Sequence, residues 1–177
     1  MARERKYTME AASAVAKLAA RHIEKYLCLK PDTAWVSNVE EYPYYRTLDI
    51  DLLWYRRKME STQKISIEIK GDRYFRTGNY FFETLSNKQK NTPGCFLYSR
   101  ANYLFYYFIG RELHIMPLQA ARDWFQARMD EFPEKETATP IGRNGEYYNT
   151  VGRLVPRWRL RKEVQLRIVP FDKAWEG

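Results

Sequence analysis

Carboxylate and ammonium side chains alternate with apolar residues in two neighbouring stretches of this sequence. Glu68 and Lys70 end the run Ile-Ser-Ile-Glu-Ile-Lys at 65–70. Asp49 and Asp51 stand upstream, in Leu-Asp-Ile-Asp-Leu-Leu-Trp. Residues two apart on a β-strand share a face. The pattern therefore predicts two strands that each turn charged side chains to one face and apolar side chains to a core.

If two such strands were neighbours in a sheet, two or three carboxylates and one ammonium group would cluster on one face of it. Mg²⁺ and Mn²⁺ prefer oxygen ligands, and a bound cation of this kind activates water beside a phosphate. We expect Asp51 and Glu68 to bind the metal. Lys70 would orient or deprotonate the attacking water and offset charge on the phosphorus. Asp49 is either a second ligand or a surface carboxylate, and the sequence leaves both open.

A Glu-x-Lys triplet on a strand is most often a surface ion pair, so its context matters. Here Lys70 closes a strand, and Asp51 lies inside the apolar stretch Ile-Asp-Leu-Leu. A carboxylate buried there without a partner or a metal would be costly. The surroundings therefore argue against an exposed ion pair, and the order of the residues along the chain is what favours a catalytic site.

The order of these residues resembles the PD-(D/E)xK nuclease superfamily, which has the restriction-endonuclease-like fold. In that family an Asp opens an apolar strand stretch, and an E-x-K triplet follows on the next strand. The matching pieces here are Asp51-Leu-Leu-Trp and Glu68-Ile-Lys, with the acidic residues 17 positions apart, as two hairpin-linked strands require. Where the family often has Pro before the Asp, this chain has Ile50, with Asp49 as a second candidate. The resemblance covers about residues 8–125.

The resemblance implies an α/β fold with a mixed central β-sheet flanked by helices, and a metal-dependent endonuclease that hydrolyses DNA phosphodiester bonds. Phage or mobile-element, junction-resolving and repair enzymes are the candidates in that class. Resolvases of this fold and small homing enzymes work as oligomers, so the resemblance is compatible with a homodimer. The cofactor implied is Mg²⁺ or Mn²⁺, with the carbonyl of Ile69 as a further ligand. Family members often add an acidic residue beyond the triplet. Glu83 is that candidate here, with an ordinary polar position as the alternative, and some branches use a first-helix residue such as Glu10 or Glu24.

The alternative is a non-catalytic nucleic-acid-binding or excision-control protein on the same fold. An active site that had lost its function would be free to lose Asp51, Glu68 or Lys70. Because all three are present, the sequence favours the enzyme. A third class is an interaction protein without a nucleic-acid partner, whose basic residues would be scattered evenly.

Positive charge dominates the composition of the chain. It has 177 residues, with 30 Lys and Arg against 22 Asp and Glu, and a formal net charge of +8. This size fits a single domain, 1–177, with a basic extension from about residue 141. The charge favours a polyanionic partner, DNA. No apolar run reaches membrane-spanning length, and the two cysteines show no metal-binding spacing. We therefore expect a cytoplasmic protein without a membrane partner, and a nucleoid-associated or phage-encoded protein is compatible with this.

DNA contacts are expected from basic side chains beyond the triplet and near the C-terminus. Arginine forks suit phosphate oxygens. The segment 157–161, Arg-Trp-Arg-Leu-Arg, alternates and predicts a strand whose basic face follows the DNA backbone. The candidates are Arg73, Arg76, Lys88, Lys90, Arg157, Arg159 and Arg161.

Hydrophobic periodicity predicts the elements that position these residues. Apolar residues recur at helical steps over 8–28 and 118–129. No strand is predicted within 73–94, and 130–150 is expected to be a loop. The predicted strands are 35–39, 47–57, 64–70, 95–98, 103–109, 113–116 and 157–161.

Overall fold

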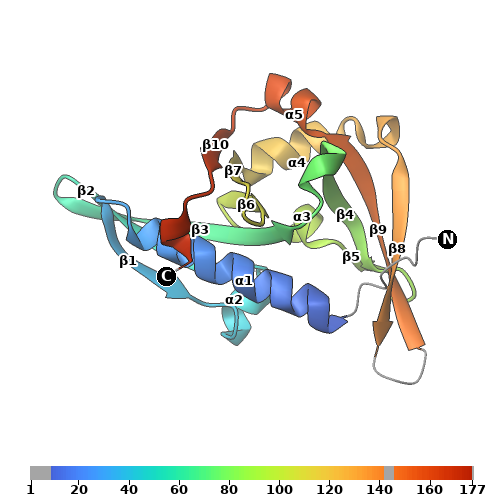
Figure 1. Ribbon diagram of the computed structural model, residues 1–177, viewed down its shortest axis with the longest axis horizontal. Coiled ribbons are helices and arrows are strands. Elements are labelled where there is room, and N and C mark those ends of the chain that lie inside the picture. The colour runs from blue at the N-terminus through green and yellow to red at the C-terminus, as the bar shows by residue number, and fades with distance from the viewer. Residues whose placement is uncertain (1–8, 142–145, 177) are drawn as a thin grey trace.

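The computed structural model describes residues 9–141 and 146–176, which form two β-sheets and several helices (Figure 1). The helices are α1 (Met9–Cys28), α2 (Pro43–Thr47), α3 (Cys95–Tyr98), α4 (Leu118–Gln126) and α5 (Arg157–Glu163), with short 3-10 turns at Phe75–Thr77, Met129–Glu131 and Lys173–Trp175. The first strands are β1 (Thr33–Asn38), β2 (Leu52–Lys58), β3 (Ser61–Asp72), β4 (Asn79–Asn87) and β5 (Thr92–Pro93). The later strands are β6 (Tyr103–Phe108), β7 (Glu112–Pro117), β8 (Glu134–Ile141), β9 (Glu146–Pro156) and β10 (Arg167–Pro170).

The larger sheet is mixed, with strand order β1-β2-β3-β6-β7-β10, and the smaller sheet has the order β5-β4-β9-β8. Neighbours in the larger sheet are antiparallel except β3 and β6, which are parallel. Parallel neighbours need a crossover connection. Here residues 73–102 leave the sheet and build β4, β5 and α3 before the chain returns as β6. The predicted α/β architecture with a mixed sheet is confirmed.

Helix α1 covers one face of the larger sheet (Figure 1). Its buried residues recur at three- and four-residue steps and include Ala19, Ile23 and Leu27. They pack in one core with Ile65 and Ile67 of β3, so the isoleucine face predicted from the alternation points toward α1. Burying one such aliphatic side chain contributes about 1.5–3 kcal/mol, which makes this apolar stripe the main stabiliser of the helix.

An aromatic core lies on the opposite face of the larger sheet. Phe82 of β4 stacks on Phe96 of α3 with ring centroids 4.1 Å apart, and Phe125 of α4 meets both rings edge-on. Tyr106 of β6 is fully buried in the same core, and its hydroxyl donates a hydrogen bond to Asp72 at the end of β3. These contacts hold β4 and α3 over the charged face of β3.

Several segments differ from the sequence-based prediction. Residues 95–98 form helix α3 rather than a strand, because a four-residue apolar run is too short for its period to distinguish the two. Residues 157–161 lie in helix α5, where Leu160 is buried. The segments 73–94 and 130–150 contain β4 and the β8–β9 hairpin, whose strands were not predicted. Their polar composition concealed strands that have one solvated face.

The strand expected from residue 47 begins at Leu52 instead. The preceding residues form α2 and a turn, in which Asp49 has a φ of 53°. Asp tolerates this left-handed conformation better than most residues. The prediction that Asp49 and Asp51 share one face of a strand is therefore wrong.

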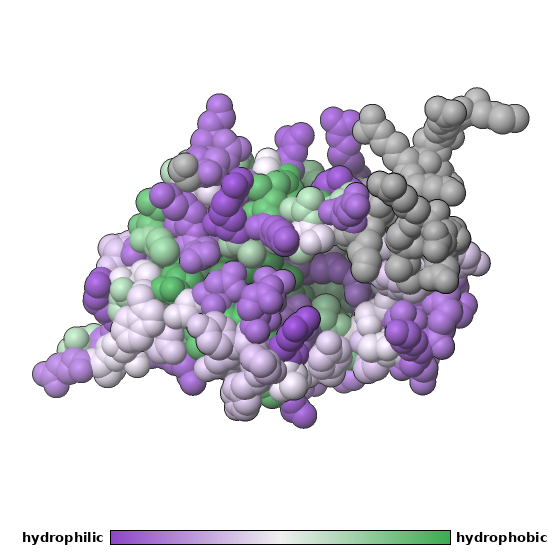
Figure 2. Space-filling view, turned by 90° about the horizontal axis from the view of Figure 1, so that it is seen from below, coloured by the Kyte–Doolittle hydropathy of each residue, from purple (hydrophilic) through white to green (hydrophobic). Residues whose placement is uncertain are grey.

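The chain beyond residue 141 contributes to both sheets. Strand β9 pairs with β4 in the smaller sheet, and β10 pairs with β7 at the edge of the larger one. Seen from below, the molecule shows projecting hydrophilic side chains around a hollowed area with apolar surface (Figure 2). Within 9–141 and 146–176, no helix has both the length and the apolar character needed to cross a bilayer.

Candidate active site

Three potential metal ligands meet between the turn before β2, the middle of β3 and the first residue of α3. A carboxylate oxygen of Asp49, a carboxylate oxygen of Glu68 and the Sγ atom of Cys95 all lie within 4.8 Å of one another. Glu68 is only 5% exposed, and Asp49 and Cys95 are half-buried. Carboxylates this close in a buried place repel each other unless a proton or a cation lies between them.

The turn that carries Asp49 is tied to the segment that carries Cys95. The N–H of Asp49 donates to the carbonyl of Arg46 at 3.3 Å, and its own carbonyl accepts from Ser99 Oγ at 2.8 Å. Ser99 directly follows α3. Glu68 reaches the same place from β3, on the face opposite the isoleucines, as the two-residue period predicts. The cluster is thus assembled by a turn, a strand and a short helix.

Asp51 lies directly before β2 and borders the same place. Its N–H donates to the carbonyl of Ile67 at 3.0 Å, and its Oδ2 accepts the main-chain N–H of Ile69 at 2.7 Å. One oxygen of Asp51 is therefore engaged on the strand that carries Glu68. Asp51 and Asp49 also line a cavity of about 220 Å³. The other residues that line this cavity are Glu40, Glu41, Arg46 and Ile50.

Two buried carboxylate oxygens of the cluster have no hydrogen-bond partner among the described residues. They are Oδ2 of Asp49 and Oε2 of Glu68. A buried acceptor left unsatisfied costs about 1–3 kcal/mol, and a charged one costs more. Coordination of one cation by both oxygens would offset that cost, and Mg²⁺ and Mn²⁺ are the cations that favour such ligands.

The environment raises the pKa of all three carboxyl groups. Burial, and then the charge of Glu83, raises the pKa of Asp49 to about 6. Burial also raises the pKa of Asp51 to about 7, against the opposing effect of the hydrogen bond from Ile69. For Glu68, burial comes first and the charges of Asp51 and Asp49 follow, and the pKa lies well above its usual range. Near neutral pH the site therefore retains protons that a divalent cation would displace.

Lys70 and Glu83 form an ion pair between Nζ and Oε1 that joins the larger sheet to the smaller one. The Lys70 side chain is 29% exposed and the Glu83 side chain 16%. Burial alone would lower the pKa of Lys70, but the charges around it, with Glu83 first among them, together outweigh burial, and the pKa is raised. Lys70 therefore remains an ammonium ion at neutral pH. Of its two predicted roles, this favours orienting water and balancing charge over accepting a proton.

Sequence reasoning missed two residues of this place, Cys95 and Tyr98. Burial, and then the charge of Glu68, raises the pKa of the Cys95 thiol well above its usual range, so the thiol is protonated. Burial, and then the charge of Asp49, raises the pKa of Tyr98 to about 12. Neither residue has a ligand-like spacing in the sequence. The sequence Pro-Gly before Cys95 predicts a turn there, but it does not predict that this turn brings Cys95 close to Glu68.

Gly94 allows α3 to approach β4 closely enough to complete the cluster. A Cβ atom at this position would lie 2.2 Å from the carbonyl oxygen of Glu83, far inside contact distance. The N–H of Gly94 donates to the carbonyl of Thr84 at 3.0 Å, which fixes the approach. A side chain here would push Cys95 away from Glu68.

Most of the predicted DNA-contacting residues are exposed. Lys88 forms an ion pair with Glu136 across the smaller sheet, with Nζ and Oε2 2.6 Å apart. Such exposed pairs contribute little and leave the ammonium accessible. The exposed members of the predicted set are Arg73, Arg76, Lys88, Lys90 and Arg161.

Arg157 has a structural role that the sequence did not reveal. Its guanidinium lies over the rings of Phe75 and Phe108, 4.1 Å and 4.9 Å from their centroids, and donates to the Phe75 carbonyl at 2.9 Å. Arg159 is engaged in an ion pair with Glu131. The prediction that 157–161 form a strand with three arginines on one face is wrong, because these residues lie in α5 and Arg157 packs on Phe75 and Phe108.

Arg157→Ala is expected to lower the free energy of unfolding by about 2 kcal/mol, because two cation–π contacts and a hydrogen bond are lost. Arg161→Ala removes an exposed arginine from the same helix and is expected to change it by less than about 0.5 kcal/mol. Urea unfolding followed by circular dichroism measures both values. Equal losses in the two variants would contradict the structural role of Arg157.

The cluster offers the carboxylate oxygens of Asp49 and Glu68 for a hard cation, and its thiol, Cys95, is uncharged. The ammonium group of Lys70 is fixed nearby on the same strand as Glu68. The site can therefore hold a divalent metal ion and stabilise added negative charge on a neighbouring group.

No protein-family model, curated protein or solved structure matches this chain.

Proposed function

We propose that this chain is a metal-dependent endonuclease that hydrolyses the phosphodiester bonds of DNA with Mg²⁺ or Mn²⁺. The observation that carries the proposal is the pair of buried, unpartnered carboxylate oxygens on Asp49 and Glu68. The ammonium group of Lys70 projects from the same face of β3 as Glu68. A cation held beside a fixed ammonium group suits phosphodiester hydrolysis, because the transition state gains negative charge.

Oxygen atoms from strand β3 and from the turn before β2 would hold the cation. Asp49, Asp51 and Glu68 supply carboxylates, and the main-chain carbonyl of Ile69 is a further candidate ligand, as in the family that the sequence resembles. When bound, the cation would polarise the phosphate and lower the pKa of a water molecule. Binding would also require the carboxyl groups to release their protons.

Lys70 and Glu83 act as a unit in this proposal. Lys70 donates hydrogen bonds to the attacking water or to a phosphate oxygen and balances negative charge. Glu83 keeps Lys70 protonated and fixes the direction of its side chain. Glu83, which the sequence predicted as catalytic, is in this view a positioning residue.

The architecture supports the same function. Helix α1 is followed by β1, β2 and β3, which pair antiparallel, and β6 later joins β3 in parallel after the excursion through β4, β5 and α3. Asp51 precedes β2, and Glu68 and Lys70 lie on the adjoining β3. The nuclease family also carries its Asp and its E-x-K on neighbouring strands of a mixed sheet. We therefore propose a restriction-endonuclease-like fold for the larger sheet.

The charge of the chain supports DNA as the substrate. The net charge is +8, and Arg73 and Arg76 are exposed in the loop that leaves the catalytic strand β3. Lys and Arg near a cleavage site contact phosphate oxygens and position the duplex. A homodimer that acts on both strands, and a cytoplasmic location, belong to this proposal.

A cleavage assay tests the proposed activity. Supercoiled, linear, branched and single-stranded DNA are incubated with and without Mg²⁺ or Mn²⁺, and the products are separated by electrophoresis. Cleavage is expected with either metal and not in EDTA. Full activity in EDTA would remove the metal from the proposal.

The second candidate is a non-catalytic nucleic-acid-binding or excision-control protein on the same fold. Two observations favour it: Glu68 is only 5% exposed, and Lys70 is held by Glu83. A scissile phosphate would have to reach both residues. Binding of DNA and Mn²⁺ without cleavage of any of the four substrates would decide for this candidate.

Asp49→Asn is expected to weaken Mn²⁺ binding by at least about tenfold, and more than Asp51→Asn does. The reason is that Oδ2 of Asp49 is buried without a partner among the described residues and a carboxylate oxygen of Asp49 lies within 4.8 Å of one of Glu68, whereas Oδ2 of Asp51 accepts the main-chain N–H of Ile69. Calorimetric titration with Mn²⁺ gives both affinities. Asp123→Asn, on the exposed side of α4, is the control and should bind Mn²⁺ like the unaltered chain. The reverse ranking would assign the main ligand to Asp51, as the family order implies.

A further inference from the structure

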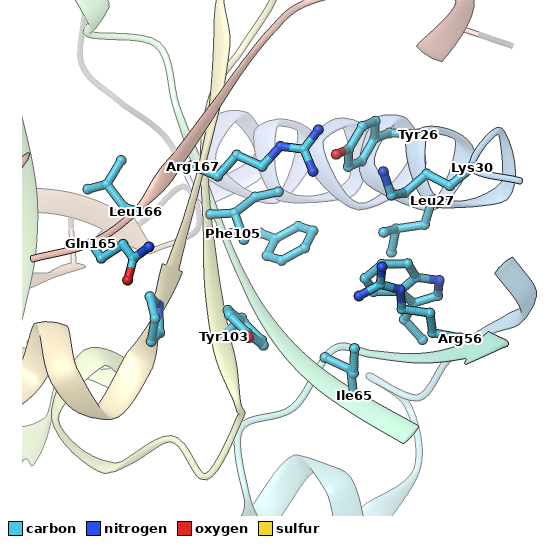
Figure 3. A pocket seen from close by; sticks show the side chains of 13 residues that line it. Tyr26, Leu27, Lys30, Arg56, Ile65, Tyr103, Phe105, Gln165, Leu166 and Arg167 are labelled. Atoms are coloured by element: carbon cyan, nitrogen blue, oxygen red, sulfur yellow. The ribbon is translucent and has the colours of Figure 1, made fainter. Parts of the chain in front are cut away.

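A second cavity, of about 440 Å³, lies on the α1 face of the larger sheet (Figure 3). Ile65 and Phe105, which belong to the core under α1, line it. Glu68 and Lys70 project from the opposite face of β3, so the sheet separates this cavity from the candidate active site. Its volume lies within the range of about 300–1,000 Å³ that is usual for small-molecule sites.

Three cationic side chains from different elements line this cavity: Lys30 after α1, Arg56 of β2 and Arg167 of β10. Arg56 forms an ion pair with Asp32. In the part of the chain that the structure describes, neither Lys30 nor Arg167 forms an ion pair with an acidic residue. Burial, and then the charge of Arg167, lowers the pKa of Lys30. Asp32 therefore balances one of the three cations, and the other two have no acidic partner within the described ranges.

The hydroxyl group of Tyr26 is also without a partner. It is buried, and it has no hydrogen bond among the described residues. Tyr26 as a whole is 8% exposed, and the Lys30 ammonium lies 5.1 Å from its ring centroid. In Figure 3 the hydroxyl points toward the guanidinium of Arg167. An unpaired hydroxyl donor beside two cations is suited to an anionic oxygen acceptor.

Three aromatic residues form what we call the aromatic wall of the cavity. Trp54, Tyr103 and Phe105 line it. The indole N–H of Trp54 donates to Thr33 Oγ1 at 2.8 Å, which fixes the ring, and the guanidinium of Arg56 lies 5.5 Å from the ring centroid. Fixed aromatic faces favour a flat ring system, since stacking on them requires little reordering.

We infer that this cavity binds a nucleoside monophosphate. The phosphate would lie against Lys30, Arg167 and the Tyr26 hydroxyl, and the base against the aromatic wall with Trp54. A phosphate dianion matches two unbalanced cations, whereas a carboxylate would match one. The site stands on the other side of the sheet and makes no use of the proposed nuclease chemistry, so it goes beyond that function.

Calorimetric titration of the full chain with AMP, adenosine and inorganic phosphate tests the inference, with EDTA present to exclude metal binding at the acidic cluster. AMP is expected to bind at least about tenfold more tightly than adenosine or phosphate alone. Lys30→Gln and Arg167→Gln should each weaken AMP binding by about tenfold. Arg57→Gln is the matched control, because Arg57 is exposed and adjacent to Arg56 on β2 but alternates to the other face.

Each other result overturns the inference in a defined way. If inorganic phosphate bound as tightly as AMP, the aromatic wall would not contribute to binding. If adenosine bound as tightly as AMP, the cations would not contribute. Equal losses in Arg57→Gln and Arg167→Gln, or no AMP binding at millimolar concentration, would remove the site. Glu68→Gln should bind AMP normally, so failure of the nuclease proposal and failure of this one are distinguishable.

Discussion

Glu68→Gln is expected to reduce metal-dependent DNA cleavage by roughly a thousandfold, the size of effect seen when one group that stabilises the transition state is removed. The substitution keeps the volume of the side chain and replaces one carboxylate oxygen of the cluster with an amide. Steady-state cleavage of a defined duplex with Mg²⁺ measures the loss. Lys70→Met should have an effect of similar size, because the ammonium group that orients the water and balances negative charge is then missing.

The control for this experiment is Glu60→Gln, at the exposed turn of the same β2–β3 hairpin. It should cleave DNA at the unaltered rate. Glu68→Gln should also melt at the same or a higher temperature, since an amide replaces a carboxyl whose ionised form is disfavoured by burial. Undiminished cleavage in a folded Glu68→Gln variant would be sufficient to reject the site.

Stability of the metal-free chain is expected to fall between about pH 4 and pH 7, and Mn²⁺ should restore it at higher pH. The pKa values of Asp49 and Asp51 in the folded chain, about 6 and about 7, lie above those of the unfolded chain. The folded state therefore binds protons more tightly than the unfolded state. The stabilisation is complete below about pH 4 and is lost as the pH rises through 6 to 7.

The expected size of this effect is large for two carboxyl groups. The raised pKa of Asp49 alone corresponds to about 3 kcal/mol across that pH range. Mn²⁺ should therefore raise the melting temperature by roughly 6–10 °C at pH 8 and by no more than about 2 °C at pH 5. Differential scanning calorimetry at both pH values measures the shifts. An equal Mn²⁺ effect at pH 5 and pH 8 would contradict the assignment of these carboxyls as ligands, and Asp49→Asn should flatten the pH dependence.

The parts of the fold that were predictable from the sequence have a regular period over enough residues. Helix α1 and the apolar face of β3 are of this kind, because the burial of one stripe determines both elements. The same period showed that Glu68 and Lys70 share a face. Short or polar segments were not predictable: α3 has four residues, and the alternating arginines of 157–161 fit a helix as well as a strand.

The candidate site was predictable only where one strand supplies it. Asp49 is placed by a left-handed turn, which follows from the tertiary contact between its carbonyl and Ser99 rather than from local preference. Cys95 reaches Glu68 because Gly94 permits α3 to approach β4. Contacts of this kind join segments far apart in the sequence, and one sequence alone carries no periodic signal for them.

A ribosome making this chain releases every residue of the acidic cluster well before it releases β9. Until then β4, which carries Glu83, has the two-residue β5 as its neighbour in the smaller sheet. A strand paired so briefly is marginally stable. The aromatic core also holds β4 through Phe82, but the pairing of β4 in the smaller sheet is completed only by β9. We therefore expect the ion pair between Lys70 and Glu83 to gain its full support from the smaller sheet late in synthesis.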